Sequence, residues 1–399
     1  MAGSLASGSK VGSRVGSTIA AAGPYREVLR HASGLNGVER IELEDSALIP
    51  ALINAHCHLE LSGAGDLRDR LVFGRGFTPW VRSLMGLREQ ILERDRAKRH
   101  IRAQAGLLYG SGTCAVADHE NSSLVKEATE GLRQPGHAGA RIIPLKEIIH
   151  PEAGLPEMAL MPGHSGGLAA HSPFLCSPDV IKWLKGLSRG LLAPFSIHVA
   201  ESEDELLFLK ERRGPLGELL DERGRLPLPY HLPRLTPVRL LQDLGVLDDR
   251  TICVHCVHVE EDEMDILAGT RANVCLCPES NRIMGVGTAP AEELMKRGIN
   301  VCLGTDSLAS NTRLDLFGEM ACLAASNPGL RPEAILRAAT EAGARALGLW
   351  PKMGRIGPGA STPILALGPI PKRLDEVCEF LVKEACRQPG FIRRMIGVG

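Results

Sequence analysis

The chain has 399 residues, 44% of them hydrophobic and 23% charged, and a formal net charge of −1. That composition supports a large buried core but offers neither a basic face for nucleic acid nor an acidic tail. Aromatic residues make up only 4% of the chain, too few for a platform on which single-stranded bases stack, so we expect no nucleic-acid partner.

The segment Met1–Gly23 is rich in Ser, Gly and Ala and lacks the continuous apolar region of a secretory signal. No apolar stretch is long enough to span a membrane, so we expect no membrane segment. The eleven cysteines lie mostly in apolar runs, and the pair Cys253 and Cys256 has no second C-x-x-C beside it. We interpret the cysteines as small apolar residues in a reducing cytosol and expect a cytoplasmic protein.

From about residue 48 onward, short apolar runs alternate with amphipathic segments of helical periodicity. The runs are almost continuously apolar, which is typical of strands buried on both faces of a sheet. Strands are predicted at 51–56, 112–118, 140–147, 167–171, 194–199, 251–256, 272–277 and 300–305. Helices are predicted at 78–96, 98–109, 178–189, 203–212, 236–245, 260–269, 290–298 and 331–349. This alternation predicts an α/β fold whose strands close a (β/α)8 barrel of the TIM type.

The segments outside this alternation differ in character. Residues 213–235 are rich in proline, and we predict a long loop there that either shapes the substrate pocket or is a solvated insertion. Strand-like pieces at Ser17–Ala21 and Glu39–Leu43, with the apolar run 363–367, predict a small β-domain built from both ends of the chain. The predicted layout is the first part of this β-domain at 1–47, the barrel at 48–349, the second part of the β-domain at 350–371 and a helical tail at 372–399.

Two histidines, His56 and His58, end the first predicted strand within the motif Asn54-Ala55-His56-Cys57-His58. Side chains two positions apart on a strand point to the same side, so both imidazoles can hold one metal ion. On its own the pair is explained equally well by two unrelated histidines in a loop.

Three more polar residues lie at the ends of predicted strands, where barrel enzymes place their active sites. They are His198, His255 and Asp306. A core histidine or a helix-capping aspartate explains any one of them, but packing does not explain the whole set. Three imidazoles and one carboxylate suit Zn²⁺ or Fe²⁺, so we predict that His56, His58, His198 and Asp306 bind one metal.

A metal held in this way lowers the pKa of a bound water and makes a hydroxide nucleophile, which then needs a group to move protons. Glu201, three residues after His198, is the candidate for this role, although a carboxylate at a helix N-terminus is the alternative. His255 could polarise the attacking water or stabilise the developing charge.

Together these motifs resemble the amidohydrolase superfamily in its branch of metal-dependent aminohydrolases and chlorohydrolases. The segments 277–281 (Cys-Pro-Glu-Ser-Asn) and 303–307 (Leu-Gly-Thr-Asp-Ser) fall in the same order as in that family. The resemblance implies one metal on the four ligands, Glu201 and His255 as the proton-transfer pair, and Asp306 as an acceptor of the water proton. Zinc is the expected metal and iron the alternative, and the family suggests a homodimer.

Within that branch, dinuclear members carry a modified lysine where this chain has 167–171, and no lysine occurs there, which favours one metal. His171, followed by Ser172 and Pro173, resembles the substrate-contacting histidine of adenosine-type deaminases. The stretches around Glu60 and Trp80 resemble aminodeoxyfutalosine deaminases of menaquinone synthesis and deaminases of methylthioadenosine and S-adenosylhomocysteine. The N-terminal part of the small domain looks shortened against the family.

The resemblance implies hydrolytic deamination of an adenine-bearing nucleoside, with attack at purine C6 and release of ammonia. Glu60, Trp80, His171, Glu201 and His255 are the predicted substrate contacts. Glu60 could instead be a structural carboxylate bound to backbone amides, and Trp80 could instead be a core residue. The alternative substrates are other heterocycles, such as guanine, cytosine or a chlorotriazine. A barrel that binds a nucleoside without catalysis is a further alternative. Such a protein would be expected to lack some of the catalytic residues, whereas all of them are present in this chain.

Overall fold

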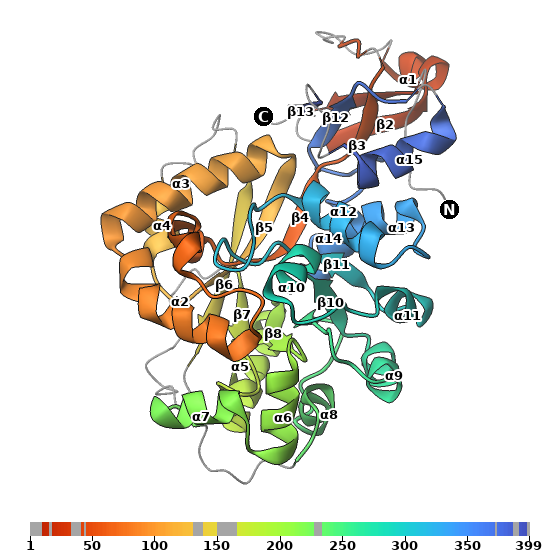
Figure 1. Ribbon diagram of the computed structural model, residues 1–399. Helices are drawn as coiled ribbons and strands as arrows, with labels where there is room; N and C mark the ends of the chain where they lie inside the picture. Colours follow the sequence, from red (N-terminus) through yellow and green to blue (C-terminus); the bar gives the residue numbers. More distant parts are fainter. Residues whose placement is uncertain are drawn as a thin grey trace.

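A computed structural model describes residues 10–15, 18–32, 41–43, 45–130, 139–149, 166–226, 234–371, 373–385 and 391–396. Its centre is a parallel sheet of eight strands that follow one another in chain order from β4 to β11 (Figure 1). The strands are β4 (Leu52–Cys57), β5 (Thr113–Glu120), β6 (Arg141–Ile148), β7 (Gly167–Ala170), β8 (Phe195–Val199), β9 (Thr251–His255), β10 (Asn273–Leu276) and β11 (Val301–Leu303). Each predicted strand matches one of these to within two residues at either end.

The first and last strands of this sheet meet and close the barrel. The backbone N–H of Thr305 donates to the carbonyl of His56 at 2.9 Å, and Cys57 forms a parallel bridge with Asp306. The residues that close the barrel are therefore the direct neighbours of the predicted metal ligands. The predicted (β/α)8 barrel is confirmed.

Helices surround the barrel on its outside (Figure 1). They are α2 (Phe77–Ile91), α3 (Arg94–Gly110), α4 (Leu124–Thr129), α5 (Pro178–Leu191), α6 (Glu203–Glu211), α7 (Pro215–Glu222), α8 (Pro237–Asp243), α9 (Glu261–Thr270), α10 (Pro278–Met284), α11 (Ala291–Lys296), α12 (Leu316–Ser326), α13 (Pro332–Arg337) and α14 (Gly343–Ala346). A 3-10 helix at Leu59–Arg70 follows β4, and a π-helical turn at Ala338–Ala342 divides the single helix predicted at 331–349. The long loop predicted at 213–235 is wrong in part, because α7 lies within it, and residues 227–233 fall outside the described part of the chain.

A small antiparallel sheet lies beside the barrel and combines a strand that precedes the barrel with two strands that follow it (Figure 1). Its strands, in the order β13-β12-β3, are β3 (Ala47–Pro50), β12 (Ile364–Gly368) and β13 (Ile392–Ile396). A hairpin of β1 (Lys10–Val15) and β2 (Thr18–Pro24) precedes α1 (Tyr25–Ala32), and α15 (Leu374–Lys383) lies between β12 and β13. The predicted small β-domain built from both ends is therefore present.

Two details of the flanks differ from the sequence predictions. The tail at 372–399 was expected to be helical, but among its described residues α15 is helical and β13 is a strand that pairs antiparallel with β12. The strand predicted at Glu39–Leu43 is not formed at 41–43, and residues 39 and 40 lie outside the described part. The ten cysteines in the described ranges are free, and no helix there is both long and apolar enough to cross a membrane.

A buried ion pair fastens α5 to the start of β9. The Lys185 side chain is fully buried, and its Nζ donates to Asp248 Oδ1 at 2.6 Å and to Thr251 Oγ1 at 2.8 Å. Asp248 also accepts from Arg189 Nε at 3.0 Å. If Asp248 is removed, the buried ammonium group of Lys185 loses its counter-charge. If Lys185 is removed, Asp248 still has Arg189 as a partner.

We expect Asp248→Asn to lower the free energy of unfolding by about 3–5 kcal/mol, because it strands the Lys185 charge. Lys185→Met replaces the charge with an apolar chain of similar length, and buried pairs replaced in this way often lose little stability. Urea unfolding followed by circular dichroism measures both. Equal losses in the two variants would contradict this account of the pair.

Candidate active site

The polar residues singled out in the sequence gather at the C-terminal ends of the barrel strands. Just there, the backbone takes a left-handed conformation at non-glycine residues: φ is 51° at Ala200, 72° at His255, 47° at Cys256 and 55° at Asp306. Each such residue costs about 1–3 kcal/mol and persists only where the surroundings hold it, as at functional sites. Hydrogen bonds from Cys256 N to Val199 O and from His258 N to Ala200 O, at 3.0 and 2.9 Å, hold this backbone.

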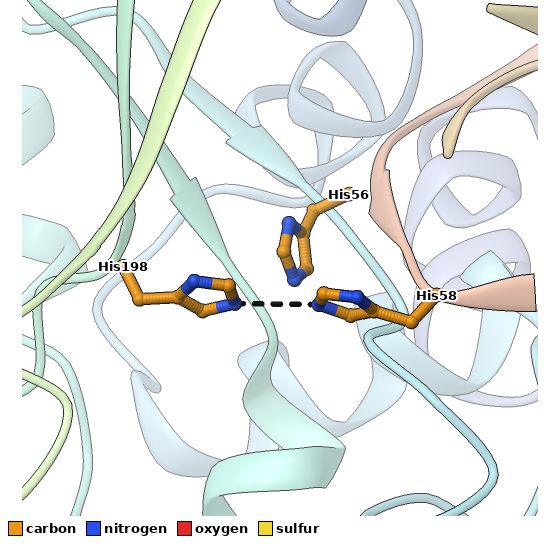
Figure 2. Close-up of side chains that lie close together, drawn as sticks. All are labelled: His56, His58 and His198. Atoms are coloured by element: carbon orange, nitrogen blue, oxygen red, sulfur yellow. Dashed lines mark hydrogen bonds between the residues drawn. The ribbon is translucent and has the colours of Figure 1, made fainter. Parts of the chain in front are cut away.

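Three histidines from two strands converge on one point (Figure 2). His56 and His58 come from the end of β4, and His198 comes from β8. One ring nitrogen from each lies within 4.8 Å of the others, and Nε2 of His58 is 3.4 Å from Nε2 of His198. All three side chains are buried. His56 lies on β4 and His58 directly follows the strand, and their rings lie on the same side, with centroids 4.8 Å apart.

Asp306 supplies a carboxylate to the same point. Its Oδ1 lies 3.7 Å from His56 Nε2 and 3.8 Å from His58 Nε2. Its Oδ2 accepts hydrogen bonds from Ser280 Oγ at 2.8 Å and Ser310 Oγ at 2.6 Å. The two oxygens therefore have separate partners, and Oδ1 alone faces the histidines. Burial raises the pKa of Asp306, but the neighbouring histidines outweigh it and hold that pKa well below its usual range.

The protonation of this cluster fits a divalent metal. Burial is the main cause that lowers the pKa of His56 to about 3 and that of His198 well below its usual range. The imidazoles of His56 and His198 are therefore neutral and carry lone pairs. Both ring nitrogens of His56 are buried without a hydrogen-bond partner among the described residues, as expected of a group whose partner is a metal. Neutral imidazoles and one carboxylate are a donor set that zinc uses.

Glu201 and His255 form a pair next to this cluster. Glu201 Oε1 lies 3.5 Å from His255 Nε2, and His255 Nδ1 lies 2.9 Å from Asn281 Oδ1. Since an amide oxygen only accepts, Nδ1 of His255 carries the proton and Nε2 faces Glu201 with a lone pair. Burial raises the pKa of Glu201 well above its usual range and lowers that of His255. Burial therefore favours the protonated carboxyl of Glu201 and the uncharged imidazole of His255.

The three remaining predicted site residues lie in different surroundings. His171 stacks on His198 with ring centroids 4.6 Å apart, and burial lowers its pKa to about 3. Glu60 Oε2 accepts from Ser122 Oγ at 2.9 Å and Asn121 N at 3.3 Å. Trp80 packs with apolar side chains, and its Nε1 donates to the carbonyl of Ala309 at 3.0 Å. These contacts match the structural alternatives for Glu60 and Trp80, and they place His171 alone of the three against the histidine cluster.

Several residues of this site were not predicted from the sequence. His119, at the end of β5, has its ring centroid 4.2 Å from that of His56, and Glu147, at the end of β6, lies between His58 and His198. The signal that found the other residues, a polar side chain at a strand end, applies to both. Ser280 and Asn281 stand in the motif at 277–281, but spacing alone does not indicate their partners.

Glu205 anchors the backbone of Glu201. Its Oε2 accepts from Glu201 N at 2.9 Å, its N–H donates to Ser202 Oγ at 3.3 Å, and its Oε1 is buried without a partner among the described residues. Burial is the main cause that raises the pKa of Glu205 to about 8. The folded chain therefore holds a proton at Glu205 that the unfolded chain releases near pH 4.5.

It follows that the stability contributed by protonated Glu205 is fully present below pH 4.5 and is lost as pH rises to about 8. We expect Glu205→Gln to reduce the fall of unfolding free energy across this window by up to about 1.4 kcal/mol per pH unit. Urea unfolding at a series of pH values measures it. Glu89→Gln, on the exposed face of α2, controls for the loss of a carboxylate. An unchanged pH slope in the Glu205 variant would contradict the expectation.

Comparisons with known proteins agree with this geometry. Residues 47–377 match the sequence profile of the Amidohydrolase family. A 5-methylthioadenosine/S-adenosylhomocysteine deaminase of Desulfitobacterium hafniense is 29% identical over 348 residues, which cover 82% of this chain and 73% of that protein.

Two crystal structures share the fold. Aminofutalosine deaminase of Helicobacter pylori, in complex with methylthio-coformycin, superposes with a TM-score of 0.78 at 21% identity, covering 92% of this chain and 90% of that one. An adenosine deaminase of Xanthomonas campestris with bound zinc gives a TM-score of 0.70 at 22% identity, covering 94% and 84%. With the profile spanning most of its length and the same barrel around its histidine cluster, the chain belongs to the amidohydrolase family.

Proposed function

We propose that this protein is a metal-dependent hydrolytic deaminase that replaces the 6-amino group of an adenine-bearing nucleoside with oxygen. The observation that carries the proposal is the position of Glu201, whose Oε1 lies 3.5 Å from His255 Nε2, beside a cluster of metal-donor side chains. The likeness to a deaminase of methylthioadenosine and S-adenosylhomocysteine supports the choice of substrate class.

His56, His58, His198 and Asp306 would hold one divalent metal, and we propose zinc, which the Xanthomonas neighbour contains. When bound, such a metal supplies a water whose pKa is lowered towards neutrality. The donor atoms in this chain are then Nε2 of His58 and His198, a ring nitrogen of His56 and Oδ1 of Asp306. The serine hydroxyls on Oδ2 hold Asp306 in the orientation that presents Oδ1.

Glu201 moves the protons of the reaction. As a neutral acid it can protonate N1 of the purine, which makes C6 electron-poor and open to attack by water. The resulting carboxylate then takes a proton from the attacking water. As the C6–O bond forms, Glu201 passes this proton to the amino group, the C6–N bond breaks and ammonia leaves with the bonding electron pair. The hydroxyl on C6 then returns its remaining proton to Glu201, which leaves a 6-oxo purine and the neutral acid. Each well-placed proton transfer contributes roughly 10²–10⁴-fold to the rate.

His255 holds Glu201 and the attacking oxygen in place. Its Nδ1–H is fixed on Asn281, so its Nε2 presents a lone pair towards the reacting groups. We propose His171 as the substrate contact among the remaining residues, because its ring stacks on His198 and its Nδ1 lacks a hydrogen-bond partner among the described residues. Glu60 and Trp80 then support the pocket wall.

A panel of nucleosides tests the proposal: aminodeoxyfutalosine, methylthioadenosine, S-adenosylhomocysteine and adenosine, each incubated with zinc-loaded protein. The expected result is loss of adenine absorbance with one ammonia released per nucleoside consumed. Guanine, cytosine and a chlorotriazine, assayed in parallel, test the other heterocycles. Turnover of one of these three with none of the adenine nucleosides would overturn the proposed substrate class.

A further inference from the structure

Glu147 is a buried carboxyl group at the end of β6 that the proposed reaction does not use. Its side chain is almost fully buried, and Oε1 has no hydrogen-bond partner among the described residues. Oε2 accepts from Asn121 Nδ2 at 2.9 Å. A buried carboxylate oxygen is costly unless a donor or a positive charge faces it.

The groups that face Glu147 are two of the proposed metal ligands. Its Oε2 lies 3.9 Å from Nδ1 of His58, and its Oε1 lies 3.9 Å from Nδ1 of His198. The other nitrogens of the same two rings, both Nε2, approach each other to 3.4 Å at the centre of the cluster. Each ring therefore has one nitrogen towards the metal position and the other towards Glu147.

The tautomer of His198 decides between two roles for Glu147. Glu147, His171 and His198 have donor atoms within 4.8 Å of one another, which could indicate a second metal position. However, His198 Nδ1 lies 2.6 Å from the carbonyl oxygen of His171, and a carbonyl only accepts. Nδ1 of His198 therefore carries a proton and cannot bind a cation, so the side of the ring that faces Glu147 is a donor.

We propose that Glu147 is a positioning residue for the metal site: its two oxygens face Nδ1 of His58 and Nδ1 of His198 and, together with the carbonyl of His171 at His198, keep both Nε2 lone pairs directed at the metal. This inference rests on the metal site of the proposed function. A divalent cation with Asp306 as its one carboxylate ligand keeps a net positive charge, which Glu147 offsets. Carboxylates placed in this way behind histidine ligands typically change metal affinity by about 10–100-fold.

Zinc affinity of the chelator-treated full-length protein, measured by competition with a chromophoric chelator, tests the proposal. We expect Glu147→Gln to weaken zinc binding by about 10–100-fold. The glutamine keeps an oxygen that accepts from Asn121, but its NH₂ group is turned towards His198. Two donors, this NH₂ group and Nδ1–H of His198, then face each other. Unfolding temperatures of both metal-free proteins show whether the fold is retained.

Glu263→Gln is the matched control. Glu263 is also fully buried, has one oxygen without a partner among the described residues, and accepts from Glu260 N at 3.0 Å with its other oxygen. We expect this variant to bind zinc as the wild type does. Equal zinc affinity in the wild type and the Glu147 variant would overturn the inference alone, whereas a wild type that binds no zinc would overturn the proposed function with it.

A second measurement does not depend on the variant folding. Nitrogen NMR of ¹⁵N-histidine-labelled, zinc-loaded wild type should show His58 and His198 protonated at Nδ1 and bound to metal at Nε2. The reverse assignment at His58, with the proton on Nε2, would overturn the proposal, because Glu147 would then face a nitrogen without a proton.

Discussion

Glu201→Gln is expected to reduce turnover by roughly 10²–10⁴-fold while the protein still binds its metal. Glutamine has the same shape, so the side chain can remain against His255, but it can neither donate an acidic proton to N1 nor accept one from water. None of the contacts described for the Glu201 side chain is with a proposed metal donor atom, so the zinc content of the variant should not change. Steady-state kinetics and elemental analysis on the same preparation measure both quantities.

Glu203→Gln provides the matched control for this variant. Glu203 lies two residues further along, at the exposed start of α6, and has the same side chain. It should leave kcat unchanged, which separates proton transfer from the general effect of one lost carboxylate. Full turnover in the Glu201 variant would refute the proton-transfer role.

The barrel and the donor set could be predicted from sequence because both depend on local pattern. Near-continuous apolar runs such as 251–256 fit only strands covered on both faces, and residues that follow such runs must meet at one end of a closed parallel barrel. That geometric constraint brings His198 and Asp306 to His56 without any knowledge of side-chain contacts. The same constraint covers His119, which follows the strand predicted at 112–118, and Glu147, which ends the strand predicted at 140–147.

The roles of the other candidate residues and the end of the chain depend on contacts between distant segments, which no local pattern encodes. The indole N–H of Trp80 meets the carbonyl of Ala309, and the carboxylate of Glu60 meets the loop after β5, so neither role follows from helix spacing. β13 carries the charged pair Arg393 and Arg394, which suggested an exposed face of a helix. It is a strand because β12 offers it a free sheet edge.

Removal of the metal is expected to abolish turnover and to lower the unfolding temperature, and added zinc is expected to restore both. The ring nitrogens of His56 are buried without hydrogen bonds among the described residues, a state that costs about 1–3 kcal/mol for each unpaired group. A metal that binds only the folded chain satisfies one of these two nitrogens, and its binding stabilises the fold by about 4 kcal/mol at a thousand times its dissociation constant. Differential scanning calorimetry with and without zinc measures the shift.

His56→Ala should lose this response to zinc, because it removes the ligand at the centre of the cluster. His100→Ala is the control: His100 lies on α3, 3.2 Å from Asp66 on the outside of the barrel, and its loss should leave the zinc shift intact. A zinc shift of wild-type size in the His56 variant would mean that the metal binds elsewhere. The unpaired ring nitrogens of His56 make the metal-free fold less stable, and the lone pair that goes unused there is what a metal would bind.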